Sequence, residues 1–383
     1  MQYVDLGVLS QKKKERSRTK KIVKWSALVF LTTIVLYAGY VLYFPAAALL
    51  REILKNPSAA LSLVKNPEGT LKSDNGRTNF LLLGIDKRDN VPYSYNLGNG
   101  EVKRNGFLSD TMLIISLDQN TKKVAMISIP RDTWVQLPSW EGHGSAYTKI
   151  NASYSYGESL GYPGGGAAMA KTVISQSLGI PIHYVTRIDF AGFKKGIDSL
   201  GGVDVKVDKA FDDWSYPDST KTASGYKHIH FNAGLQHMSG SRALEFVRSR
   251  KGTNGEGSDF ARAKRQQKVI LAARDKALSL FTIFDPLKIN KLFSAFGETV
   301  STDVDLAALP KLYKYSREIN AATIKNLVLD TTNYMIHPPS SQYGGAYVVI
   351  PKGGSWTNIQ QAVKNIFQEE AKATTEAGKK QKQ

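Results

Sequence analysis

The stretch Thr78–Ile85, which reads T-N-F-L-L-L-G-I, decides the fold of this chain. A continuous apolar run of this kind predicts a strand that is buried on both faces. The run ends at Asp86, and an insertion rich in Tyr, Asn and Gly follows at Asn90–Gly106. We therefore expect the folded body to begin at residue 78.

Two more strands follow, Thr111–Leu117 and Val124–Ile129, and the segment between them, D-Q-N-T-K-K, is a hairpin signal. Strand and helix patterns alternate in the rest of the body, where the polar and aromatic segment Asp208–His230 predicts a loop. This alternation, hairpin included, predicts an α/β/α layered domain with a central mixed sheet. The remaining strands are expected at Tyr184–Asp189, Val203–Val207 and Ile324–Leu329, and the helices at Ala167–Leu178, Phe190–Leu200, Leu235–Phe246, Phe260–Leu280, Pro286–Phe296, Leu306–Ile319 and Trp356–Phe367.

A membrane anchor is expected before this domain. Trp25–Phe44 is a run of twenty residues without a charge, which as a helix spans the roughly 30 Å core of a bilayer. Residues 1–24 carry eight Lys or Arg against two acidic residues, so the positive-inside rule places them in the cytoplasm and the body outside the cell. A cleaved signal peptide with its site at Ala46–Ala48 is the alternative, but the apolar run is long for one. We favour an uncleaved, single-pass anchor in the cell membrane.

These patterns divide the chain into five parts. A basic cytoplasmic segment, 1–24, precedes the transmembrane helix, 25–44, and a juxtamembrane helix with a turn-rich linker covers 45–77. The extracellular folded domain takes 78–368, and a disordered basic tail, 369–383, ends the chain.

Composition narrows the chemistry. The formal net charge is +18 and part of it lies on the body, which fits an anionic partner or substrate. Cysteine is absent, which excludes thiol catalysis, disulfides and Cys-ligated metals. Neither a P-loop nor a dinucleotide or nucleophile-elbow motif is present. The six histidines, including His228 and His230, do not form a convincing metal set, so we favour structural or solvent-exposed roles for them.

A cationic cluster lies in Arg248–Gln267, R-S-R-K-G-T-N-G-E-G-S-D-F-A-R-A-K-R-Q-Q. Two arginines precede a Gly-rich loop, and a helix then opens on which further polar side chains share one face. Arginine captures phosphate in a bidentate manner, and a helix N-terminus adds N–H donors. The stretch therefore predicts a polyanion clamp, with a solvated basic helix face as the alternative. The members of the cluster are Arg248, Arg250, Asp259, Arg262, Arg265 and Gln266.

Charged residues also recur at the ends of expected strands. Asp86 comes just after one strand, Asp110 just before the next, and Arg131 follows a third. In an antiparallel arrangement both carboxylates reach one end of the sheet, and such a pair beside arginines suits Mg²⁺ bound together with phosphate oxygens. A role as turn former or N-cap is the alternative for each aspartate. The glycines at 164–166 fit a flexible helix entrance better than a phosphate site.

Taken in order, the motifs of the body resemble one family. N-F-L-L-L-G-I-D, L-S-D-T-M, I-S-I-P-R-D-T, K-I-N-A-S-Y, F-x-G-F-x-K-x-I-D-S-L-G-G-V-D-V, F-V-R-S-R and D-F-A-R-A-K-R-Q-Q follow one another between about Asn79 and Leu280. This ordered set is similar to the LytR-CpsA-Psr family, and the short membrane anchor also fits. One departure is the long insertion between the two aspartates, and another is Trp134, which stands where some members carry a basic residue.

The resemblance implies an extracellular phosphotransferase that moves teichoic acid, capsule or a similar glycopolymer from a polyprenyl-diphosphate carrier to peptidoglycan. It implies Mg²⁺, with Mn²⁺ as a substitute, at Asp86 and Asp110, and catalytic roles for Asp110, Arg131 and Asp132. Lys149 and Asn151 match the K-I-N-A motif, where a structural role is at least as well supported. The resemblance places the diphosphate on Arg131, Arg248, Arg250, Arg262 and Gln266, and it gives Asp132 and Asp259 an orienting role. Arg265 and Asp259 complete the expected substrate-binding set as members of the cationic cluster.

Several points stay open in the sequence. Asp110 or Asp132 is the candidate general base, and the helices Ala167–Leu178 and Phe260–Leu280 are candidates to line a trough for the prenyl chain. A polyprenyl-diphosphate hydrolase and a non-enzymatic, membrane-anchored regulator are the rival functions. A nucleic-acid partner is not expected, because the anchor places the basic body outside the cell and no helix-turn-helix is recognisable. Candidate acceptor-binding residues are Tyr93, Tyr95, Asn96, Trp134 and Trp140.

Overall fold

The computed structural model describes residues 70–87, 93–96, 102–217, 225–280, 296–305 and 308–368. The predicted membrane helix Trp25–Phe44, the predicted tail 369–383 and all but the last residue of the predicted helix Pro286–Phe296 lie outside these residues. Within the described ranges, no helix has the length and apolar character needed to cross a membrane. All described residues belong to one compact unit, Lys65–Gln383.

A six-stranded mixed sheet forms the centre of this unit, with the strand order β13-β8-β1-β4-β5-β14. The pairs β1–β8 and β5–β14 are parallel, and the other three pairs are antiparallel. The predicted mixed sheet is therefore confirmed. Its strands are β1 (Arg77–Ile85), β4 (Ser109–Asp118), β5 (Val124–Ile129), β8 (Tyr184–Asp189), β13 (Val300–Thr302) and β14 (Lys325–Val328).

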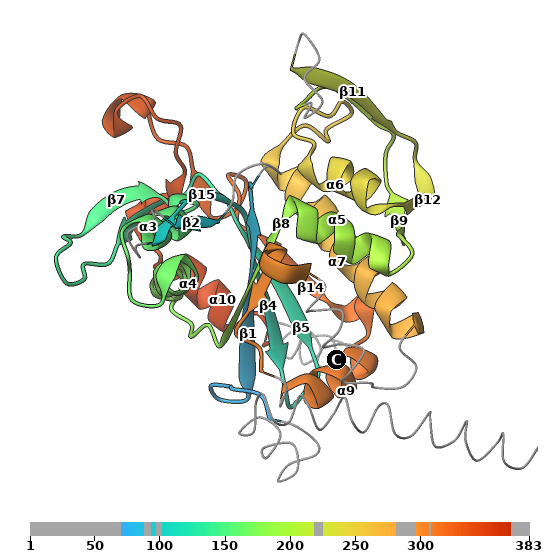
Figure 1. Ribbon diagram of the computed structural model, residues 1–383, viewed down its shortest axis with the longest axis horizontal. Helices are drawn as coiled ribbons and strands as arrows, with labels where there is room; N and C mark the ends of the chain where they lie inside the picture. The colour runs from blue at the N-terminus through green and yellow to red at the C-terminus, as the bar shows by residue number, and fades with distance from the viewer. Residues whose placement is uncertain are drawn as a thin grey trace, which may run out of the picture. The chain divides into compact units, whose positions relative to one another are not determined.

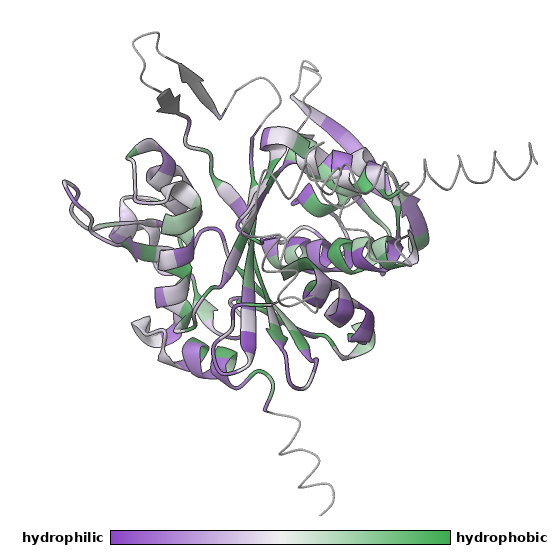
Figure 2. Cartoon of the chain, turned by 60° about the horizontal axis from the view of Figure 1, so that its bottom comes forward, coloured by the Kyte–Doolittle hydropathy of each residue, from purple (hydrophilic) through white to green (hydrophobic). Residues whose placement is uncertain are grey.

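Helices cover the sheet on both sides (Figure 1), as the α/β/α prediction requires. On one side lie α3 (Ala152–Ser159), α4 (Gly165–Leu178) and α10 (Thr357–Lys364), and on the other lie α5 (Phe190–Ser199), α6 (Gly240–Arg248) and α7 (Asp259–Leu280). The helix α9 (Leu309–Glu318) contacts α7. Hydrophobic residues run along the middle of the central strands (Figure 2).

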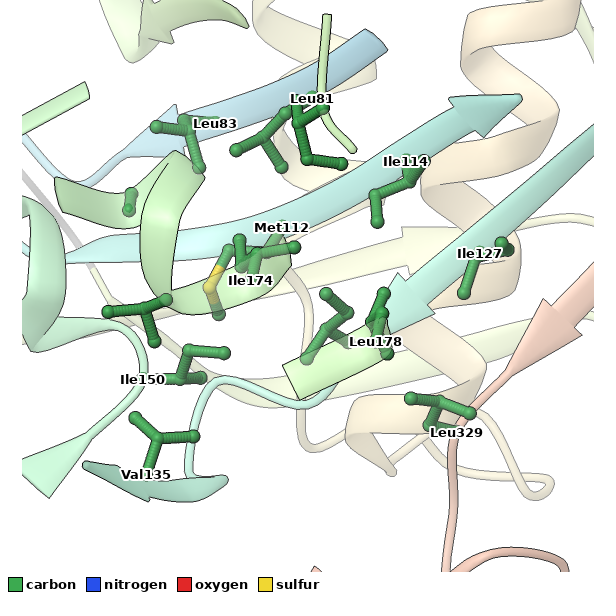
Figure 3. Packing of buried hydrophobic residues seen from close by; sticks show 14 of the residues in the cluster. Leu81, Leu83, Met112, Ile114, Ile127, Val135, Ile150, Ile174, Leu178 and Leu329 are labelled. Atoms are coloured by element: carbon green, nitrogen blue, oxygen red, sulfur yellow. The ribbon is translucent and has the colours of Figure 1, made fainter. Parts of the chain in front are cut away.

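The main core lies between the sheet and α4. Leu81, Leu83, Met112 and Ile114 of the sheet pack with Ile174 and Leu178 of α4 (Figure 3), and all six are at most 2% exposed. Along β1, buried residues alternate with half-buried ones. The expectation that this strand is buried on both faces is therefore wrong in part. One face of the strand packs into the core, whereas Leu82 and Gly84 of the other face line a cavity. Because the wall of this cavity is apolar, the sequence of the strand is apolar on both faces although only one of them is buried in the core.

The segment predicted as a loop, Asp208–His230, is instead mostly a β-hairpin. It contains β10 (Phe211–Pro217) and β11 (Tyr226–Phe231), which pair antiparallel. The strand pattern is hard to recognise because a charged side chain, Asp213, takes an inward position between the buried Phe211 and Tyr216.

The predicted helix Leu235–Phe246 is wrong in its first half. β12 (Gly234–Met238) pairs there with β9 (Val203–Val207), and α6 begins only at Gly240. The linker predicted up to residue 77 is also shorter than expected, since Leu71 is buried in a core cluster. The remaining short elements are β2 (Ser94–Asn96), β3 (Val102–Arg104), β6 (Trp134–Leu137), β7 (Ala146–Lys149), β15 (Met335–Ile336), β16 (Ile350–Pro351), η1 (Gly297–Thr299), η3 (Ala321–Thr323), η4 (Ser340–Tyr343) and η5 (Lys352–Gly354).

The close contact of α5 with α6 depends on Gly240, because a Cβ atom there would lie 2.2 Å from the carbonyl oxygen of Lys194. We predict that Gly240→Ala lowers the free energy of unfolding by about 1–3 kcal/mol, as overpacking does. Urea denaturation measures this difference. Gly144→Ala is the control, since a Cβ there has no neighbour within 4 Å. Equal stability of the two variants would contradict the close packing.

Candidate functional site

A cavity of about 980 Å³ lies between the sheet and the helices α5, α6 and α7. This volume is at the upper end of the range of small-molecule pockets. Charged side chains gather at its mouth, and the rest of its wall is mainly apolar. The apolar lining includes Leu82, Ile188, Phe190, Phe193, Ile197, Leu200, Leu244, Val247, Val269, Ile270 and Ala273.

A β-bulge lies next to the two candidate metal ligands at this mouth. Gly84 pairs with Thr111 and Ile85 pairs with Ser109, so Asp110 is the extra residue of the bulge. Bulges re-aim side chains next to functional sites. Asp86 follows β1 directly, and its N–H donates to the carbonyl of Leu108 over 3.0 Å. Asp86 and Asp110 therefore come from neighbouring strands and both line the cavity.

The P-R-D and K-I-N segments hold the carboxylates in place. Arg131 donates to Oδ2 of Asp110 over 2.5 Å, and Asn151 donates to Oδ1 of the same residue over 3.1 Å. Lys149 donates to Oδ1 of Asp132 over 2.7 Å. Burial alone would lower the pKa of Arg131, but the nearby Asp110, Asp132 and Asp259 raise it above its ordinary value. The Lys149–Asn151 segment thus positions both candidate bases.

The opposite side of the mouth carries the arginines of α6, α7 and the loop between them. Arg250 makes a two-pronged contact with Asp259, at 2.8 and 3.2 Å, and Arg262 contacts the same carboxylate at 3.2 Å. Burial would raise the pKa of Asp259, but Arg262, Arg250 and Arg131 lower it below its usual range. Asp259 therefore holds the guanidinium groups of Arg250 and Arg262 in place.

Two of these arginines keep donors for a ligand. Among the described residues, Arg248 forms no ion pair; it lies 4.0 Å from the ring centre of Phe190 and donates to the hydroxyl of Tyr216. Arg262 is buried, and its Nε has no hydrogen-bond acceptor in the described part of the chain. A buried guanidinium donor without an acceptor is costly, so an anion at the mouth would be stabilised there.

Arg265 does not belong to this set, which corrects the expectation that every arginine of the cluster binds the ligand. Its guanidinium donates to the carbonyls of Phe246 and Ser249 and to Glu256, and it is 3% exposed. It does not line the cavity. The residue lies beside the Arg262–Gln266 face of the helix and points toward the Gly-rich loop, so it is a positioning residue for that loop.

Asp213 is a cavity residue that the sequence did not reveal. Its carboxylate accepts from the hydroxyl of Ser249 over 2.6 Å and from the N–H groups of Arg250 and Lys251. It fastens the segment that carries the clamp arginines to the β10–β11 hairpin. A strand prediction for this hairpin could have drawn attention to an acidic residue at an inward position.

One face of α7 leads from the charged mouth into the apolar interior. Arg262 and Gln266 are followed on that face by Val269, Ile270 and Ala273, and all five line the cavity. The expectation of an apolar lining therefore holds for α7. It is wrong for the helix Ala167–Leu178, because α4 packs into the core on the other side of the sheet.

The donor set at the mouth fits a hard divalent cation bound with phosphate. The cavity lining contains six carboxylates and six Lys or Arg side chains, so an added diphosphate brings negative charge that the protein alone does not balance. Oxygen donors are the ligands that Mg²⁺ prefers. Within the described ranges, no group of three or more His, Cys, Asp or Glu could hold a metal by itself, and a site of one or two carboxylates relies on substrate oxygens.

Other candidates take structural places. His228 and His230 both contact one oxygen of Asp212 on the exposed face of the β10–β11 hairpin. At the start of α4, a Cβ on Gly166 would lie 2.2 Å from the carbonyl of Tyr154, and its N–H donates to Glu158. Gly166 thus serves the packing of α3 on α4.

The charged mouth and the apolar interior together suit an amphipathic anion. Comparisons with known proteins agree on one family. The LytR_cpsA_psr family matches residues 51–365, and the chain therefore belongs to the LytR-CpsA-Psr family.

Named relatives and a solved structure share this assignment. The chain is 31% identical over 307 residues to TagU of Oceanobacillus iheyensis, a polyisoprenyl-teichoic acid–peptidoglycan teichoic acid transferase, with 78% of this chain and 83% of the relative covered. It is 32% identical over 235 residues to the Bacillus subtilis transferase TagV, covering 61% and 55%. The crystal structure of B. subtilis TagV aligns with a TM-score of 0.53 and 26% identity, over 76% of this chain and 98% of that one.

We predict that Arg265→Met lowers the free energy of unfolding by about 3–5 kcal/mol, because Glu256 and two carbonyls lose a buried cationic donor. Lys264→Met on the exposed side of the same helix is the control, and we expect a change within about 0.5 kcal/mol. Chemical denaturation of both variants measures the difference. If Arg265→Met were fully stable and bound lipid diphosphate poorly, the residue would belong to the clamp after all.

Proposed function

We propose that this protein is a membrane-anchored, extracellular phosphotransferase that moves a glycopolymer from a polyprenyl-diphosphate carrier to peptidoglycan. The main support is the cavity whose cationic mouth continues into an apolar interior, because a lipid diphosphate has the same two parts. The names of the relatives TagU and TagV supply the polymer class, teichoic acid, and the acceptor, peptidoglycan.

The diphosphate lies between the two sides of the mouth in this proposal. Arg131 stands on the sheet side, and Arg248, Arg250 and Arg262 stand on the helix side, where guanidinium forks match phosphate oxygens. The prenyl chain extends along α7 past Val269 and Ala273. Gln266 donates to the hydroxyl of Thr111 over 2.9 Å, which orients its amide at the boundary between the two parts.

In the reaction, a sugar hydroxyl of the acceptor attacks the phosphorus that carries the glycopolymer. A new P–O bond forms, the bond to the prenyl phosphate breaks, and polyprenyl phosphate leaves with the electron pair. Asp110 or Asp132 accepts the hydroxyl proton. Fixed arginines stabilise the charge on the equatorial and leaving oxygens.

A divalent cation, Mg²⁺ or Mn²⁺, belongs to this proposal, with Asp86 and Asp110 as its protein ligands. When bound, it would neutralise phosphate charge and polarise the phosphoryl group. Asn151 and Arg131 hold Asp110 in one orientation, which is what a metal-ligating carboxylate needs.

The test of function uses the purified full chain with lipid-diphosphate-linked oligosaccharide and peptidoglycan oligomers. We expect a covalent glycan–peptidoglycan adduct and polyprenyl phosphate in equal amount. Arg131→Lys and Arg248→Lys keep the charge but lose the fork, so each should cost about 2–4 kcal/mol of transition-state stabilisation. Arg317→Lys on the exposed end of α9 is the control.

Two results would replace the proposal. Polyprenyl phosphate formed without any adduct would identify a hydrolase. Lipid-diphosphate binding with neither product, together with altered envelope synthesis in cells, would identify a regulator.

Metal removal gives a separate prediction. A chelator should abolish transfer, and Mg²⁺ or Mn²⁺ should restore it without Zn²⁺, because the donors at the site are oxygens. Asp110→Asn should raise the Mg²⁺ concentration for half-maximal rate, or abolish turnover. Chelator-resistant transfer would contradict the metal site.

The location rests on the charge asymmetry around Trp25–Phe44, which supports an N-terminus in the cytoplasm and the domain outside the cell. Protease added to intact protoplasts should digest the domain and spare the anchor. If the domain became digestible only after cell lysis, it would lie inside the cell, where it could not act on a cell-wall acceptor.

A further inference from the structure

A two-stranded ribbon stands beside the mouth of the cavity. In β6–β7, Trp134 pairs with Lys149 and Gln136 pairs with Tyr147. Paired residues share a face of the ribbon, and the alternate residues Val135 and Leu137 are buried in the main core. Trp134, Gln136, Tyr147 and Lys149 therefore form the outward face, and we name this face the ribbon surface.

The ribbon surface is continuous with the reaction site. Its inner end, Lys149, lines the cavity and holds Asp132, one of the two candidate bases. The N–H of Trp134 donates to the carbonyl of Val349 over 2.9 Å, and the N–H of Val349 donates to the carbonyl of Asp132 over 3.0 Å. These bonds place Tyr347, a lining residue that is 52% exposed, next to the ribbon.

Aromatic rings with exposed area continue the surface away from the mouth. The ring of Trp134 stacks on Tyr147 with centroids 6.5 Å apart, and Tyr343 meets Trp134 edge-on at 5.5 Å. Tyr147 is 60% exposed, and its hydroxyl donates to Oε1 of Gln136 over 3.3 Å. Rings that present both a flat apolar area and polar groups suit the C–H faces and hydroxyls of pyranose sugars, whereas a membrane or a helix would require a wider apolar area.

Two other aromatic candidates for sugar binding, Tyr93 and Trp140, are already engaged, and the side chain of Tyr95 lies outside the described part of the chain. Tyr93 donates its hydroxyl to Asp189, and its ring packs on Phe107. Trp140 stacks on His143 and packs against Tyr162 and the main core.

The position of the ribbon relative to the sheet indicates whether it binds the donor glycan or the acceptor glycan. The ribbon packs on α3 and α4, whereas the lipid cavity lies under α5, α6 and α7 on the other side of the sheet (Figure 1). In phosphoryl transfer the attacking and leaving oxygens are roughly in line. In the proposed reaction the lipid phosphate leaves toward the cavity, so an acceptor hydroxyl in line with it arrives from the opposite side, where the ribbon lies.

We propose that the ribbon surface, with Trp134, Tyr147 and Tyr347 as stacking platforms and Gln136 and Lys149 as polar contacts, binds the glycan strand of the peptidoglycan acceptor. This proposal rests on the proposed function and adds the place where the acceptor is held. In this role the three rings are positioning residues, because they orient the acceptor sugar and do not touch the phosphorus.

The test measures acceptor binding and kinetics separately in the full chain. Tyr147→Ala should weaken binding of a soluble peptidoglycan tetrasaccharide and raise the KM for this acceptor about tenfold, in line with the loss of one aromatic contact. The KM for the lipid donor and the background hydrolysis of the donor should not change. Tyr147→Phe keeps the ring and should behave nearly as the native protein.

Trp214→Ala is the matched control, because Trp214 is 67% exposed on the β10–β11 hairpin and does not line the cavity. It should leave the acceptor KM unchanged. If Tyr147→Ala raises the KM for the donor instead, the surface holds the donor glycan and the proposal is overturned. Unchanged acceptor binding in Tyr147→Ala overturns it as well.

Measuring acceptor binding in the absence of the lipid donor tests this proposal separately from the proposed function on which it rests. If the native chain transfers nothing but Tyr147→Ala still loses tetrasaccharide binding, the surface stands and the transferase function falls. If transfer proceeds and no variant of the ribbon affects the acceptor, the function stands and the surface falls.

Discussion

The spacing between α7 and the sheet is the constraint on which the cavity depends. The hydrophobic effect favours closing an empty apolar space, and protein interiors contain few voids of this size. Three side chains of α7 instead donate to sheet residues: Arg262 to the carbonyl of Asp110, Gln266 to Thr111, and Gln267 to Ser128 over 3.0 Å. Hydrogen bonds have a required length, so they set how near the helix can approach. The polar residues of α7 thus keep an apolar space open.

The mouth is arranged before any ligand arrives. Asp110 is held by Asn151 and Arg131, Asp132 by Lys149, and the Arg250 segment by Asp213. Electrostatic stabilisation is most effective when dipoles and charges need not reorganise during the reaction. The carboxylates keep several arginines in fixed directions, and this explains why a site proposed to bind an anion contains as many acidic as basic side chains.

Much of this arrangement could be predicted from local patterns. The strands Val124–Ile129, Tyr184–Asp189 and Val203–Val207 have the expected bounds, because uninterrupted apolar or alternating runs are local signals. Helical spacing also placed Arg262 and Gln266 on one face, whereas the direction of Arg265 depends on carbonyls of the chain that only the folded structure brings near. Asp213 and Tyr347 were missed for the same reason, since their neighbours are distant in sequence.

The bulge at Asp110 has a consequence for how the family can vary. Asp86 and Asp110 are fixed by the ladder between β1 and β4, so the length of the connection between them does not enter their geometry. For a flexible connection, each doubling of length costs only about 0.6 kcal/mol of closure entropy. The connection between Asp86 and Asp110 is therefore a place where evolution can lengthen, shorten or rewrite the chain without changing the geometry of the two carboxylates.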